Sequence, residues 1–538
     1  MTMLERAAEL TPAQAATRDV IRTDLSVALA WAGRGGDGER LAAAVVADTL
    51  DVDVRGRAAS WLASSLLLRG RPHESRELCR QALASGVGSD RANILLRTVL
   101  QIAAVALGER SGAVDRMREL LAEATALGDA ALRSSCLQGL ALAEANEGCL
   151  DAATGYGAAA VREAESVRTP QAFMGNSHVM YAWILEEQDR LGEALETAER
   201  LRRVVGVRSE APTMAQIERW RARAHFTAGR WDDALVDLDS ALTVYDTGMD
   251  IWPEPLALRA LIAVHRGQLD GARDDLSRFD AALAAGGPCL VLDQPVLARP
   301  FLLQAEGQVV QAVEVLTAAW EIAEAALAMA KPAIGPQLAR LAVETGDLAT
   351  ARRVCSALGV LAATNPTVAR LNAAALWATG TTEADAGILV QAVHEQQRSA
   401  RPLELAMVRE DAAAAMARDG RLDAARELLC QSLAGYEGLL ARQRSASARA
   451  RLRALGVQAG STGKRGRPAS GWEALTGAEY RVVQLVAERL SNQEIAERLF
   501  VSRRTVETHV SHALVKLGFA ARREMTAAAR HRHASKNP

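Results

Sequence analysis

A short pattern, Gly or a similar turn residue followed five positions later by Ala, recurs along most of this chain of 538 residues. Between Gly108 and Gly346 successive copies start 40, 41, 40, 38, 40 and 39 residues apart. Glycine adopts the left-handed conformation that ends a helix, and a small residue shortly after it lets the next helix pack closely against the first. Each copy therefore predicts one antiparallel helix pair. The copies occupy residues 108–113, 148–153, 229–234, 267–272, 307–312, 346–351 and 420–425, with weaker ones at 70–75 and 189–194 and a degenerate one expected from Gly380.

A single helix pair cannot cover its own apolar face, so repeated pairs are expected to stack into a solenoid. Aromatic residues make up only 4% of the chain, and Ala and Leu dominate, which favours close helix-on-helix packing. No long uncharged apolar stretch is present, so we expect no membrane span and no signal peptide. Six scattered cysteines without a CxxC pair predict buried thiols in a reducing cytoplasm.

The copies resemble tetratricopeptide repeats of the longer variety over about residues 30–456. We assign residues 1–456 to this array and expect its concave surface to sense an effector or bind a partner. The helical pattern is interrupted at residues 246–255 and 286–300. Trp252 and Arg299 are candidates for lining a pocket there, but ordinary loops between helices are the simpler interpretation.

The net charge of −2 conceals a division between an acidic body and a basic tail. Residues 439–538 carry 19 Lys/Arg against 7 Asp/Glu, whereas the rest of the chain carries 44 against 58. A basic end on an acidic body is typical of a nucleic-acid-binding module attached to another domain. Residues 457–471 are rich in Gly, Ser and basic residues and predict a flexible linker, so the module is expected at 472–538.

Three short helices are predicted after the linker. Two of them begin with capping boxes, in which Thr476 is followed by Glu479 and Ser491 by Glu494. The third follows Ser502 after a tight turn. Helix, short turn and helix is the arrangement in which the later helix enters the major groove of DNA.

The third helix has two distinct faces. Five apolar residues at helical spacing should pack inward against Ile495 and Leu499: Val506, Val510, Ala513, Leu514 and Leu517. On the outward face we expect Glu507 to accept from a cytosine amino group, Thr508 to touch a thymine methyl and Ser511 to bond to either kind of base. The remaining candidate contacts to DNA, mostly to phosphates, are Asn492, Gln493, Arg503, Arg504, Thr505, His512 and Lys516.

The stretches LTGAE, LSNQEIAERL, VSRRTVETHVSHALVKLG and AARREMTAAA, within residues 475–529, are similar to the LuxR-type (GerE-like) helix-turn-helix. The resemblance implies a four-helix domain in which the third helix reads DNA, the last (residues 522–531) is available for dimerisation and the DNA sites are two-fold. One departure is visible, because Arg489 stands where the family usually has Gly. A helix end there needs a different cap, which puts the geometry between the first two helices in question, although Arg489 could equally reach a phosphate.

The expected fold class is all-α, a tetratricopeptide-like solenoid followed by a small helix-turn-helix domain. The large regulators that this arrangement resembles carry an ATP-binding domain, but no G-x-x-x-x-G-K-[ST] loop occurs here. No catalytic, metal-binding or dinucleotide motif is present either, so we predict no enzyme activity, cofactor or metal. The sequence predicts a cytoplasmic transcription regulator, with activation favoured by the resemblance, that binds promoter DNA as a homodimer and acts with RNA polymerase. The alternative is an interaction scaffold whose tail binds DNA weakly.

Overall fold

The computed structural model describes residues 11, 17–86, 88–167, 176–206, 211–245, 253–285, 296–326, 328–457, 471–475, 477–499 and 503–534. Within these residues the regular structure is helical throughout, which confirms the predicted fold class. None of the helices in the described ranges is long and apolar enough to cross a membrane.

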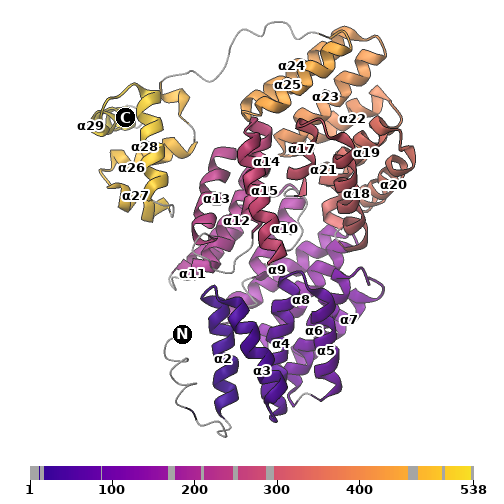
Figure 1. The fold of residues 1–538 in the computed structure, drawn as a ribbon, viewed down its shortest axis with the longest axis vertical. Coiled ribbons are helices and arrows are strands. Elements are labelled where there is room, and N and C mark those ends of the chain that lie inside the picture. The colour runs from indigo at the N-terminus through magenta and orange to yellow at the C-terminus, as the bar shows by residue number, and fades with distance from the viewer. Residues whose placement is uncertain are drawn as a thin grey trace.

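The helical array, coloured from indigo through magenta to orange, is followed by the yellow C-terminal domain, which lies beside it (Figure 1). Where the connection is described, consecutive helices are joined by short turns, and consecutive helices pack against each other as antiparallel neighbours. The first half comprises α2 (Thr17–Trp31), α3 (Gly35–Asp48), α4 (Val52–Leu68), α5 (Pro72–Ala84), α6 (Asp90–Ala106), α7 (Ala113–Ala126), α8 (Ala130–Asn146), α9 (Leu150–Ser166), α10 (Asn176–Glu187), α11 (Leu191–Gly206), α12 (Ala211–Thr227) and α13 (Trp231–Tyr245). The second half comprises α14 (Glu254–Arg266), α15 (Leu269–Ala284), α17 (Ala298–Ala305), α18 (Val309–Ala326), η1 (Ala328–Ala330), α19 (Lys331–Thr345), α20 (Leu348–Thr364), α21 (Ala369–Thr382), α22 (Ala386–Gln397), α23 (Pro402–Arg418), α24 (Leu422–Gly438) and α25 (Arg442–Ala454).

The repeated Gly marks the helix end, as predicted. Gly229 has φ 73° and its N–H donates to the carbonyl of Phe226, while the following Arg230 N–H donates to His225. This is the hydrogen-bond pattern of a glycine-terminated helix. Ala234, five positions later, is fully buried where α13 packs against α12. The corresponding small residues are also buried in the other copies: Ser75, Ala113, Ala153, Ala194, Ala272, Ala312, Ala351 and Ala425.

In two irregular copies a residue other than glycine adopts the left-handed conformation at the helix end. Asp189 has φ 61°, so the weak copy that it begins follows the pattern. The degenerate copy does not start at Gly380, which lies inside α21. A Cβ there would come within 2.8 Å of Leu389, so this glycine allows α22 to approach closely. The left-handed residue of that copy is Ala384, with φ 55°.

The second half of the array closes against the first. Arg110, before α7, donates to the carbonyl of Glu324 on α18 across 214 residues of sequence. The Asn365 side chain donates to the Gly148 carbonyl and accepts from the Leu150 N–H, 217 and 215 residues away. Arg401 reaches Asp189 across 212 residues. These contacts all join residues 212 to 217 positions apart, so repeats about five units apart in the sequence lie against each other.

The two interruptions of the helical pattern lie largely outside the described residues, and Trp252 is among those left out. Arg299 belongs to α17, where its guanidinium contacts both carboxylate oxygens of Asp280 at 2.6 and 2.7 Å. Arg299 therefore forms an ion pair on the outside of the helices, and it does not line the large cavity described below.

The C-terminal domain is built from a short η2 (Trp472–Ala474) and four helices, α26 (Gly477–Ala487), α27 (Asn492–Leu499), α28 (Arg503–Leu517) and α29 (Arg522–Ala534). Its apolar core is separate from that of the array. Val482 and Val486 of α26, Ile495 of α27, Val506 of α28 and Met525 of α29 meet there, each no more than 1% exposed.

Candidate nucleic-acid interface

The start of α27 is fixed by the predicted capping box. The Ser491 N–H donates to Glu494 Oε2 at 2.7 Å, and the Glu494 N–H donates to Ser491 Oγ at 3.2 Å. These hydrogen bonds satisfy two N–H groups that the helix itself cannot satisfy. The backbone bond from Ser491 lowers the pKa of the Glu494 carboxyl, so the cap is ionised near neutral pH. Thr476, the first residue of the other predicted box, lies outside the described residues.

Arg489 ends α26 in the way a glycine would. It has φ 68°, its N–H donates to Val486, and the next N–H, of Leu490, donates to Leu485. The helix end is therefore formed, at the cost of holding an arginine in the left-handed region. The departure from the family pattern strains this turn but leaves its hydrogen bonds in place.

The inward face of α28 confirms the helical-face assignment. Val506 and Ala513 are fully buried and Val510 is 8% exposed, while Leu514 and Leu517 are partly buried against the same core. Ile495 of α27 belongs to this core. The Leu499 side chain lies outside the described part of the domain.

The outward face of α28 is a polar ridge, composed of Arg503, Glu507, Thr508, Ser511 and His512. All five side chains are exposed. Arg503 Nε lies 2.9 Å from Glu507 Oε1, so these neighbours form an ion pair one helical turn apart. Arg504 and Thr505 belong to α28, but their side chains are not among those described.

The other candidates lie beside the ridge and have partners within the domain. Lys516 Nζ lies 2.8 and 2.7 Å from the two oxygens of Glu479, a carboxylate only 3% exposed on α26. Asn492 is half-buried and its Oδ1 accepts from Arg522. Gln493 is exposed. Lys516 and Asn492 thus also position α28 and α27 within the domain.

Arg522 is a positioning residue that sequence reasoning missed. Besides bonding to Asn492, its Nη2 donates to the Leu490 carbonyl at 2.6 Å, so the first residue of α29 fastens the turn before α27. Spacing gave no signal for this contact, because the partners are 30 and 32 residues apart. On the same helix, Met525 and Ala529 are buried, while Arg523, Glu524 and Arg530 are exposed.

One side of the C-terminal domain contacts the array. Arg481 on α26 lies 2.6 Å from Asp233 on α13, and a small cavity of about 180 Å³ between them is also lined by His509. Burial in this contact lowers the pKa of His509, against the opposing influence of Glu479, Asp232 and Asp233. The polar ridge of α28 remains exposed beside it.

Within the described residues no group of three His, Cys, Asp or Glu side chains could hold a metal ion. A buried apolar side, a capped preceding helix and an exposed polar ridge are the features that α28 shares with the recognition helix of a helix-turn-helix domain. Arg, Thr, Ser and Glu side chains on such a ridge can bond to phosphates and to base edges.

Comparison with known families identifies this domain. Residues 473–529 match the family described as bacterial regulatory proteins, luxR family (GerE). The chain therefore carries a LuxR-type helix-turn-helix at its C-terminal end, as its motifs predicted.

The relatives share this domain only. A putative HTH-type transcriptional regulator of Mycobacterium bovis is 60% identical over 60 residues, which are 11% of this chain and 7% of the relative. A putative HTH-type regulator of Mycobacterium tuberculosis is 58% identical over the same length, with the same shares covered. The oxygen regulatory protein NreC of Staphylococcus aureus is 41% identical over 54 residues, 10% of this chain and 25% of NreC. The chain thus spans a small fraction of the relatives that it matches.

Solved structures of helical repeats resemble the array. Aspartyl phosphate phosphatase F from Bacillus subtilis is 12% identical and covers 66% of this chain and 96% of its own, with a TM-score of 0.38. A Rap protein complexed with competence and sporulation factor is 12% identical and covers 72% and 99%, with a TM-score of 0.39. The tetratricopeptide-like repeats of a putative kinesin light chain from Podosopora anserina are 19% identical and cover 36% and 96%, with a TM-score of 0.29.

Proposed function

We propose that this chain is a transcription regulator that binds promoter DNA through α28, while its helical array senses an effector or a protein partner. The polar ridge carries this proposal, because its side chains are exposed on a helix whose opposite side is locked into the domain core. Glu507, Thr508 and Ser511 would read base edges, with His512 beside them. Asn492, Gln493, Arg503, Arg504, Thr505 and Lys516 would contact phosphates.

The regulator is proposed to bind as a homodimer and to act as an activator in contact with RNA polymerase. Exposed residues of α29, among them Arg523 and Arg530, offer a surface for dimerisation beside the buried Met525. The site of action would be the cytoplasm, where bacterial promoters lie. The role is one of binding and not of catalysis. Domain limits of 1–456, 457–471 and 472–538 are part of the same proposal.

Selection of duplexes from a random pool by the full-length protein tests the function. A two-fold motif should be enriched, with half-sites separated by about one helical turn or a multiple of it. Enrichment of a single half-site would contradict the dimer but not DNA binding. No enrichment at low salt would instead favour the second candidate, an interaction scaffold with a weak DNA-binding tail.

A further inference from the structure

A cavity of about 500 Å³ lies inside the second half of the array. Its walls come from α14, α17, α18, α19, α21, α22 and α23, and it is bounded at the end of the array by α25. This volume is in the range of pockets that hold small organic ligands. Neither the repeat pattern nor the proposed DNA contacts account for it.

The inner lining of the cavity carries three arginines and two carboxylates, one positive charge in excess. Arg340, Arg444 and Arg451 line it with side chains 14%, 15% and 30% exposed, whereas its two buried carboxylates are Glu410 and Asp411. The other two charged residues in its lining, Glu344 and Arg418, are at the exposed rim.

Both buried carboxylates are already engaged. Arg451 lies 3.1 Å from Glu410 and 2.5 Å from Asp411. Glu410 also accepts from the Tyr436 hydroxyl at 2.8 Å, and Asp411 accepts from Trp377 Nε1 at 2.7 Å. Arg451 therefore compensates about one of these two negative charges. The other is shared between Arg340 and Arg444, so the three arginines and two carboxylates together keep one positive charge in excess.

Among the described residues, Arg340 and Arg444 have only long contacts to carboxylates. The nearest carboxylate oxygen to Arg340 is that of Glu344 at 3.8 Å, and its hydrogen bond at 2.7 Å goes to the neutral Gln304. The nearest to Arg444 is Glu410 at 3.7 Å. Burial lowers the pKa of Arg340, and the neighbouring Arg444 and Arg451 lower it further, against the opposing influence of Asp411 and Glu410.

Unsatisfied buried polar atoms lie in the same wall. Both ring nitrogens of His265, a residue 1% exposed, and Nε of Arg444 have no hydrogen-bond partner within the described structure. A buried donor without a partner is costly, so such atoms commonly mark a place that a ligand or water completes. Arg444 also lies over the rings of Phe301 and Tyr436, at 5.5 and 5.8 Å, which orients its guanidinium.

Apart from Gln304, Thr381, Gln443 and Ser447, the remainder of the lining is apolar or backbone. Phe301 of α17, Val309 of α18, Leu341 of α19 and Leu389 of α22 face the cavity together with Val264 of α14. An inorganic anion alone would leave this surface uncovered. A ligand that combines a charged group with an apolar body would cover both parts.

We propose that this cavity binds a small organic anion, whose carboxylate or phosphate group lies between Arg340 and Arg444 and whose apolar part packs against Phe301 and Leu341. The planar guanidinium groups suit the oxygens of either anionic group. The proposal deepens the proposed function, because it names the class of ligand that the array would sense. Binding of the anion does not depend on that function, but an effect of the anion on DNA binding would rest on it. The link is α25, which supplies Arg444 and Arg451 and is the last array helix before the C-terminal domain.

Isothermal titration of the full-length protein, in the absence of DNA, tests the binding site. The probes are benzoate for a carboxylate, phenyl phosphate for a phosphate and benzamide for the uncharged ring. At least one anion should bind once per chain with a dissociation constant of about 1 mM or tighter, and benzamide should bind at least about tenfold more weakly. The comparison of benzoate with phenyl phosphate distinguishes the two anionic groups.

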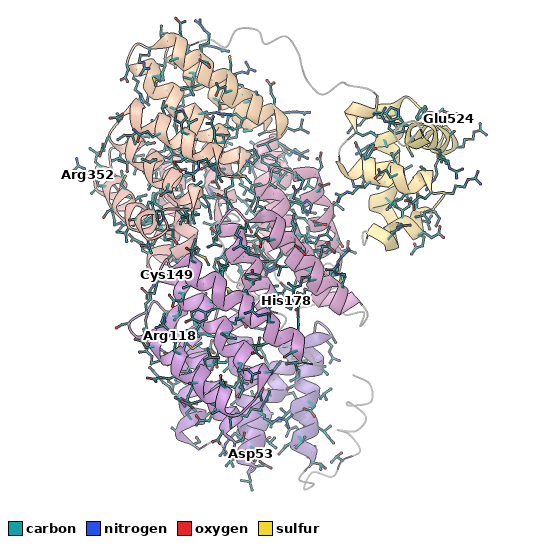
Figure 2. The ribbon with its side chains drawn as sticks, turned by 180° about the vertical axis from the view of Figure 1, so that it is seen from behind. Asp53, Arg118, Cys149, His178, Arg352 and Glu524 are labelled. Atoms are coloured by element: carbon teal, nitrogen blue, oxygen red, sulfur yellow. The ribbon has the colours of Figure 1, made fainter. Side chains whose placement is uncertain are left out.

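Substitutions locate the site. Arg340→Gln and Arg444→Gln should each weaken binding of the anion about 10- to 100-fold. Arg352→Gln is the matched control and should leave it unchanged, since Arg352 projects from the outer side of α20 (Figure 2). Circular dichroism verifies folding, and if one variant unfolds the other carries the test.

The proposal is overturned if neither anion binds the wild-type chain with a dissociation constant of about 1 mM or tighter, if benzamide binds as tightly as the anions, or if both cavity variants bind as the wild type does. DNA binding is measured in parallel on the same preparation, so the two proposals can fail separately. A chain that binds the anion but no DNA would overturn the regulator and keep the cavity. A chain that binds DNA but neither anion would overturn the cavity proposal and keep the regulator.

Discussion

The ammonium group of Lys516 lies within 2.8 Å of both oxygens of Glu479, and so connects the end of the recognition helix to the buried side of α26. Glu479 is 3% exposed and Lys516 is 31% exposed. Lys516→Met leaves a carboxylate in the domain interior without its main cation. We expect a loss of local stability of about 1–3 kcal/mol, less than for a fully buried pair because the lysine is partly solvated.

Hydrogen–deuterium exchange of peptides from α26 and α28 in the full-length protein measures this loss. Arg498→Met is the control, because Arg498 pairs with Glu488 at 2.9 Å between side chains that are 59% and 51% exposed. It should cost less than about 1 kcal/mol. Equal effects of the two substitutions would show that Glu479 does not depend on Lys516.

The left-handed turn at Arg489 predicts a stabilising substitution. Arg489→Gly should increase the stability of the C-terminal domain by about 1 kcal/mol, because glycine adopts a φ of 68° without the steric cost that arginine bears. Gly518→Ala is the reverse control at the end of α28, where φ is 71° and no atom lies within 4 Å of an added Cβ. The unfolding free energy of the C-terminal domain, measured by hydrogen exchange in denaturant, should rise for Arg489→Gly and fall for Gly518→Ala. A lower stability of Arg489→Gly would contradict the strain at this turn.

Different substitutions on α28 should affect the sequence preference and the overall affinity for DNA separately. Glu507→Ala should relax the preference at one base pair by about 1–3 kcal/mol, because Glu507 is exposed on the ridge where a cytosine amino group can reach it. Arg504→Ala should weaken binding to all sequences alike. Affinities for a panel of single-base variants of the selected site check both. A uniform loss from both substitutions would show that the outward face is wrongly assigned.

Asn365 makes two of the hydrogen bonds that join the two halves of the array. Asn365→Ala should destabilise the array by about 1–3 kcal/mol, since it removes hydrogen bonds to the Gly148 carbonyl and the Leu150 N–H in a buried place. Asn372→Ala serves for comparison, because that side chain makes an exposed bond to the Pro366 carbonyl. Urea denaturation of both variants gives the result, and similar midpoints would mean that the contact between the two halves contributes little.

The folded array should become less stable in acid because His265 is buried in its neutral form. Burial, with a smaller contribution from Arg444, lowers the pKa of His265 to about 3 from 6.5. Between these values the unfolded chain binds a proton that the folded chain does not, so stability is full above pH 6.5 and declines as the pH falls, by up to about 1.4 kcal/mol per pH unit. His265→Phe retains stacking between Trp231 and Phe301 and should flatten this part of the profile. An unchanged pH profile in the variant would rule out His265 as the cause.

Features that are local in sequence could be predicted, and those that join distant residues could not. The Gly and Ala of each repeat, the cap of Ser491 and Glu494, and the inward side of α28 follow from spacings of a few residues. The contact of Asn365 with Gly148 and the pair of Lys516 with Glu479 join residues 217 and 37 positions apart, which no periodicity specifies. The turn at Ala384 was missed because a left-handed alanine has no local signal. The arginines of the cavity converge only once the solenoid has formed.

The central claim is that the exposed ridge of α28 reads DNA. Its most direct test compares the full-length wild type with the triple variant Glu507→Ala, Thr508→Ala and Ser511→Ala, measuring the affinity for the selected duplex and for a scrambled one across a range of salt concentrations. The wild type should prefer the selected duplex, with an affinity that falls steeply with salt, and the triple variant should bind both duplexes equally while retaining a similar salt dependence. A triple variant that keeps the wild-type preference would contradict the account.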